Sequence, residues 1–126
     1  MTKDEVLEKF GQILMSEVRD EAIEKYEMIA AGTLKSTPAM ELNKKLSSFS
    51  DEQLSIVRQL VASSIDDVIY HFLWMLEQHE EDIDMTCSED AESTKENVIN
   101  ISDGLSGELY TEDGWIAKFS NYKENY

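Results

Sequence analysis

The chain has 126 residues, of which 41% are apolar, and this size suits one hydrophobic core, so we expect a single domain over residues 1–126. Its 27 acidic and 11 basic residues give a formal net charge of −16. Such a charge disfavours binding to nucleic acid or to an anionic membrane, because both would repel it. The natural complement is a basic protein, although the same charge also serves solubility.

The sequence contains one cysteine, Cys87, so it allows no internal disulfide and no cysteine-based metal motif. The first residues are polar, and the most apolar run, residues 68–76, is much too short to span a bilayer. These features predict a cytoplasmic protein without a cofactor.

The first predicted helix covers residues 2–31. Thr2 and Glu5 have the spacing of a capping box, and Gly32 is a natural helix stop. A shorter helix is expected from Thr37 and Pro38 to about residue 46, since proline is favoured in the first turn. Apolar residues recur at helical spacing along the first helix: Val6, Leu7, Phe10, Ile13, Leu14 and Val18.

The longest predicted helix covers residues 50–82, and Ser50 with Gln53 marks its start. One side of it is expected to be buried and carries Leu54, Val57, Val61, Ile65, Val68, Phe72, Met75 and Leu76, widened by Ala62, Ile69 and Leu73. A second apolar group lies roughly opposite and includes Ile56, Leu60, Tyr70 and Trp74. Two apolar sides need two covers, so we expect a homodimer with Ile56, Leu60 and Trp74 at or near the shared surface.

Residues 84–97 are acidic and rich in serine, as is typical of a mobile linker between a helical part (residues 1–83) and a tail (residues 98–126). The alternation from Trp115 to Phe119, after the turn residues Asp113 and Gly114, predicts a β-hairpin in the tail. The predicted fold class is therefore mainly α with a small β element (α+β). The expected architecture is an antiparallel bundle of about three helices with a C-terminal β-hairpin.

Three charged residues fall on apolar stripes. Glu17 and Glu21 lie in the stripe of the first helix, and Arg58 lies in that of the long helix. An unpaired buried charge would cost several kcal/mol, so we predict a buried or half-buried ion pair between Arg58 and Glu17 or Glu21.

A metal-dependent hydrolase is an alternative. Asp67 and His71 are four residues apart, as are Glu17 and Glu21, so these four side chains could meet across two helices and bind a metal ion. The paired Glu-x-x-His motif of di-iron bundles is missing, and solvated carboxylates with a hydrogen-bonded histidine explain the pattern equally well.

The leading hypothesis is a non-enzymatic binding protein. The acidic run at the end of the long helix, Glu77, Glu80, Glu81 and Asp82, is the predicted surface for a basic protein partner. In size and acidity the chain is similar to bacterial immunity proteins and other small inhibitors of basic toxins, a resemblance that identifies no residue. A third possibility is a homodimeric helical protein with a structural or accessory role.

Overall fold

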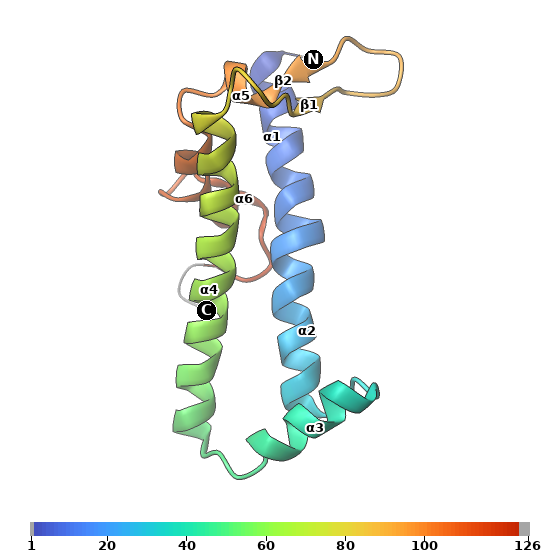
Figure 1. Cartoon of the computed structure of the whole chain (residues 1–126), viewed down its shortest axis with the longest axis vertical. Helices are drawn as coiled ribbons and strands as arrows, with labels where there is room; N and C mark the ends of the chain where they lie inside the picture. Colours follow the sequence, from blue (N-terminus) through green and yellow to red (C-terminus); the bar gives the residue numbers. More distant parts are fainter. Residues whose placement is uncertain (1, 124–126) are drawn as a thin grey trace.

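A computed structural model describes residues 2–123 and is dominated by two long helical segments (Figure 1). The first consists of α1 (Lys3–Leu14), a π-helical turn η1 (Met15–Arg19) and α2 (Asp20–Ala31). The second is α4 (Asp51–Gln78), which runs antiparallel to the first, while α3 (Thr37–Leu46) crosses the end at which the two are joined. The predicted fold class, mainly α with a small β element, is confirmed.

The predicted helix starts and the stop at Gly32 are confirmed by capping contacts, whereas the long helix ends at Gln78 and not at residue 82. The Thr2 hydroxyl accepts the N–H of Glu5, and Ser50 with Gln53 forms a reciprocal capping box. Gly32 ends α2 with a φ of 74°, a left-handed conformation that glycine adopts without steric cost. The cap of α3 is Ser36, which places Pro38 in the first turn, where no N–H is needed.

The β element lies elsewhere than predicted. Strands β1 (Thr86–Cys87) and β2 (Glu96–Asn97) pair antiparallel inside the stretch expected to be a linker. The segment expected to form a hairpin contains α5 (Val98–Ile101), the 3₁₀ helix η2 (Leu105–Leu109) and α6 (Trp115–Phe119). Residues 124–126 of the predicted tail lie outside the described residues.

The placement of the hairpin was wrong because the signal in residues 115–119 was ambiguous. Trp115 and Ile116 are both buried, at 2% and 0% exposure. Consecutive residues of a strand point to opposite faces, whereas a helix can bury both against one core. The local sequence of five residues was too short to distinguish these periods.

The main core lies in the half of the molecule where α1 begins and α4 ends (Figure 1). There the segment after β2 packs against α1 and α4, and the ring centroids of Phe10 and Trp115 are 5.8 Å apart in an edge-to-face arrangement. The buried residues of this core are Leu7, Met15, Ile69, Leu73, Leu76, Val98, Ile99, Leu105, Leu109, Trp115 and Ile116.

The side of α4 that was expected to be buried is covered in part, and Leu54, Val57, Val61, Ile65 and Met75 on it are half-buried. The structure buries Ala62, Ile69, Leu73 and Leu76, while Val68 is 70% exposed and Phe72 is 41% exposed. Helical spacing shows that a helix has apolar sides, but it does not show which side meets the neighbouring helix.

Candidate functional site

A buried arginine links three segments of the chain in the middle of the molecule. Arg19 ends the π-helical turn and is 1% exposed. Its Nε donates to Oδ1 of Asp66 at 2.6 Å, and a second guanidinium nitrogen lies 3.3 Å from Oδ2. Its remaining terminal nitrogen donates to the Ser120 hydroxyl at 2.7 Å and to the Tyr122 carbonyl. One side chain thus ties together both long helical segments and the C-terminal segment.

Asp20 completes this network from the next position on the chain. Its Oδ1 accepts the Ser120 hydroxyl, and its Oδ2 accepts the N–H of Asn121 at 2.9 Å. Asp20 and Ser120 are 5% and 2% exposed. A buried network in which these charges are paired and hydrogen-bonded positions the chain. Its role is therefore structural.

The predicted ion pair involves different residues. Glu17 and Glu21 are exposed, so their predicted burial is wrong. Nε of Arg58 donates to Oε1 of Glu27 at 3.1 Å, and the two side chains are 43% and 32% exposed. The buried arginine is Arg19, which the sequence reasoning missed.

The four candidate metal ligands do not form a cluster. Within residues 2–123, no group of three or more His, Cys, Asp or Glu side chains is arranged to hold a metal ion. His71 is exposed, and its Nδ1 is 2.7 Å from the backbone oxygen of Asp67. The arrangement therefore gives no support to a metal centre built from Glu17, Glu21, Asp67 and His71.

Charge is distributed unequally along the molecule. We call residues 20–65 the stem, and residues 2–19 together with 66–123 the head. The head holds 19 acidic and six basic residues, a net charge of −13, whereas the stem holds seven acidic and five basic residues, a net charge of −2. Glu124, outside the described residues, accounts for the remainder. Nearly all of the net charge is therefore gathered at one end.

Several basic side chains of the head are engaged in internal contacts. Lys118 pairs with Glu8, which raises the pKa of the lysine, and Lys123 donates to the carbonyl of Ala117 at 2.7 Å. Lys9 donates to the Ser88 carbonyl at 2.7 Å and to that of Glu89. The carboxylates of the head are thus only partly balanced by neighbouring cations.

The acidic run predicted to bind a partner divides into two parts. Glu77 is half-buried, and its carboxylate accepts the N–H of Ser106, so this residue positions η2. Glu80, Glu81 and Asp82 are exposed in the turn after α4. Nδ1 of His79 lies 3.7 Å from Oδ2 of Asp82.

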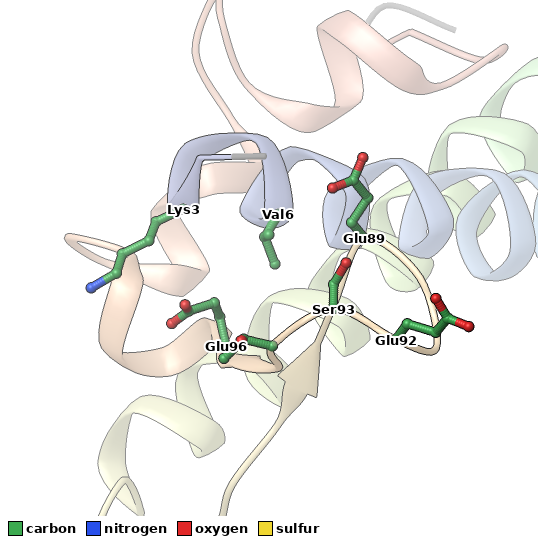
Figure 2. Close-up of a pocket in the computed structure, with 7 residues that line it drawn as sticks. Lys3, Val6, Glu89, Glu92, Ser93 and Glu96 are labelled. Carbon is green, nitrogen blue, oxygen red and sulfur yellow. The ribbon is translucent and has the colours of Figure 1, made fainter.

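The head also contains an acidic hollow with a volume of about 330 Å³. It lies between the first turn of α1 and the loop that joins β1 to β2, and Figure 2 shows Val6 pointing from α1 toward this loop. Three glutamates line it, Glu89, Glu92 and Glu96, and Lys3 is on its α1 side. The composition of this stretch predicts a linker and gives no sign of the hollow.

The loop beside the hollow is held in shape by its own hydrogen bonds. Oδ1 of Asp90 accepts the N–H groups of Glu92 and Ser93, both at 2.9 Å. These bonds to the charged carboxylate lower the pKa of Asp90. Together with Lys9 on α1, they set the positions from which Glu89 and Glu92 project.

The three residues predicted to lie at a dimer interface are exposed in the single chain. The exposed fractions are 60% for Ile56, 66% for Leu60 and 46% for Trp74. They lie along one edge of α4. Exposure in a single chain does not test contact with a second copy, so an interface there stays a prediction.

No protein-family model, curated protein or solved structure matches this chain. Of the helices within residues 2–123, none is both long enough and apolar enough to cross a membrane. Its function must therefore be inferred from its own surfaces.

Proposed function

We propose that this chain is a non-enzymatic binding protein whose acidic head captures a basic protein partner. The observation that carries the proposal is the hollow lined by Glu89, Glu92 and Glu96 on a head with a net charge of −13. A role as an inhibitor or immunity protein, which covers the basic surface of another protein, belongs to this class.

The hollow suits a lysine or arginine side chain of the partner. Glu89, Glu92 and Glu96 border the hollow (Figure 2), so their negative charge would attract the cationic group, and Val6 would contact the methylene stem. The exposed turn Glu80, Glu81 and Asp82 extends the negative field of the head. Such a field increases the rate of encounter with a basic protein more than it slows dissociation.

The test uses a fluorescent oligolysine peptide as a defined basic probe. Three substitutions in the hollow, Glu89→Gln, Glu92→Gln and Glu96→Gln, remove three negative charges. The matched control removes three exposed charges from the stem: Glu21→Gln, Glu41→Gln and Glu52→Gln. Three lost ion pairs of about 0.5 kcal/mol each should weaken binding roughly tenfold in the hollow variant.

The stem variant should bind the peptide nearly as well as the wild type, because its altered sites are remote and screened by salt. Equal weakening in the two variants would show that only total charge matters, and would reject the hollow as the binding site.

A further inference from the structure

A second surface, on the stem and the first turn of α4 beyond it, is apolar and uncovered. On α4, Leu54, Val61 and Val68 are seven residues apart, with Val57 between the first two. Leu54, Val57 and Val61 are only half-buried, and Val68 is the most exposed of the large apolar residues, at 70%. Seven-residue spacing of this kind is typical of a seam between packed helices.

The seam forms one wall of a groove with a volume of about 370 Å³. Helix α2 contributes the other wall, with Ala22, Tyr26 and Ile29, and Leu42 and Leu46 of α3 close the end. Lys25 of α2 and Lys45 of α3 also line the groove. Val57 and Val61 are the lining residues from α4. The groove therefore joins all three stem helices into one apolar face.

This face is turned away from the segment that covers the other side of α4. Tyr70 contacts that segment, with ring centroids of Tyr70 and Tyr110 6.2 Å apart. At about 100° per residue, Val61 lies on the opposite side of the helix from Tyr70. Among residues 2–123, no element after α4 lines the groove.

The charge distribution restricts what can cover the face. Between residues 53 and 76, α4 carries only Arg58, Asp66 and Asp67 as charged residues, and the stem has a net charge of −2. Two copies of this chain repel each other through their heads, but they can approach through their stems. The basic partner proposed for the head has no electrostatic reason to choose the stem.

The exposed area is also large for a monomer. A compact protein of 14.4 kDa exposes about 6,800 Å². This chain exposes 8236 Å². The elongated shape of the two long segments (Figure 1) contributes to this excess of about 1,400 Å², and a standard interface takes roughly 800 Å² from each partner.

We propose that a second copy of this chain covers the apolar face of the stem, so that the α2–α4 pairs of two copies form a four-helix layer. The interface is isologous, as in most homodimers. The copies lie antiparallel, because this arrangement places the two acidic heads at opposite ends. Each assembly then carries two acidic heads, a property beyond the capture of one partner by one chain.

The test is the mass in solution, measured by light scattering at tens of micromolar, of the wild type, Val68→Glu, Val68→Lys and Leu60→Glu. The wild type and Leu60→Glu should have twice the 14.4 kDa of one chain, since Leu60 is neither in the seam nor among the residues that line the groove. Both Val68 variants should have the mass of one chain. The lysine variant shows that buried charge, and not added negative repulsion, breaks the interface.

All three substitutions are at sites exposed in the single chain, so the circular dichroism spectrum should stay helical in every variant. A wild type of 14.4 kDa would overturn the proposal. Dissociation by Leu60→Glu but not by the Val68 variants would also overturn it, because the interface would then be the edge with Ile56 and Trp74.

Discussion

Arg19 and Asp66 join the two long helical segments through two hydrogen bonds, from Nε to Oδ1 at 2.6 Å and from a second nitrogen to Oδ2 at 3.3 Å. Arg19 is almost fully buried, and the Asp66 side chain is 17% exposed. The pair lies where the acidic head meets the nearly neutral stem. Both residues belong to the head, so the pair ties the two long segments together at this boundary.

Replacing Arg19 by Met should lower the free energy of unfolding by about 3–5 kcal/mol, because the change leaves Asp66 partly buried without its partner. The control is Arg58→Met, which removes a more exposed pair and should cost about 1 kcal/mol or less. Urea unfolding followed by circular dichroism measures both. The double variant Arg19→Met/Asp66→Leu should recover much of the loss, and an unchanged midpoint in Arg19→Met would contradict this role.

Gly11→Ala should destabilise the head by about 1–3 kcal/mol, because the added Cβ would overlap the indole ring of Trp115. Gly107→Ala is the control, since a Cβ there has no heavy atom within 4 Å. Thermal unfolding distinguishes the two variants. Equal melting temperatures would show that Trp115 does not pack on α1 at Gly11.

Glu108 should make the protein less stable as the pH rises. Burial, followed by the negative charge of Asp103, raises the pKa of Glu108 above its ordinary value of 4.5 in the folded state. The folded chain then holds this proton more tightly than the unfolded chain. Stability is therefore lost as the pH rises from the unfolded value through the higher folded value.

The variant Glu108→Gln lacks this titration. The difference in melting temperature between Glu108→Gln and the wild type should grow in favour of the variant over that pH window and then stay constant. Melting curves at a series of pH values, with the exposed Glu112→Gln as a surface control, measure it. A difference that does not change with pH would argue against a raised pKa.

Substitutions in the acidic run at the end of α4 should affect either stability or binding, depending on the residue. Glu77→Ala should lower the free energy of unfolding by about 1–3 kcal/mol, because it leaves the N–H of Ser106 without its acceptor. The exposed triple variant Glu80→Gln/Glu81→Gln/Asp82→Asn should keep the stability of the wild type and bind the oligolysine probe more weakly. Loss of stability in the triple variant would assign these carboxylates to the fold instead.

Local signals were sufficient to predict the helices of the stem and their ends. Ser50 with Gln53, Gly32 and Pro38 each act within a few residues, so the sequence shows their effect directly. The central location of the longest helix could also be predicted from its apolar content. Which of its sides remained open depended on where residues 98–123 pack, and this information is not local.

The π-helical turn explains why the inward-facing residues of the first segment were predicted incorrectly. Projection at a constant 100° per residue placed Glu17 and Glu21 on the inner stripe. The turn at residues 15–19 adds one residue to the helical repeat, so the inward positions after it are displaced along the chain. Arg19 and Ile23 are buried as a result. No signal in a single sequence marks such a turn clearly.

The head was only partly predictable. Its acidity was evident from composition, and Glu80, Glu81 and Asp82 were found because they follow one another at a helix end. The hollow depends on a loop that folds back on α1 through Lys9, a contact between residues about 80 positions apart in sequence. Contacts of this range have no pattern in the sequence.

The most direct test of the account is one sedimentation experiment on the wild type with the fluorescent oligolysine peptide, repeated over a series of sodium chloride concentrations. Salt screens the attraction between the head and the peptide, so the bound fraction of peptide should fall as salt rises. Salt also screens the repulsion between two negatively charged copies, so the fraction of protein dimer should rise. Opposite trends are the predicted result, and a fall in both fractions, or peptide binding that does not respond to salt, would contradict the account.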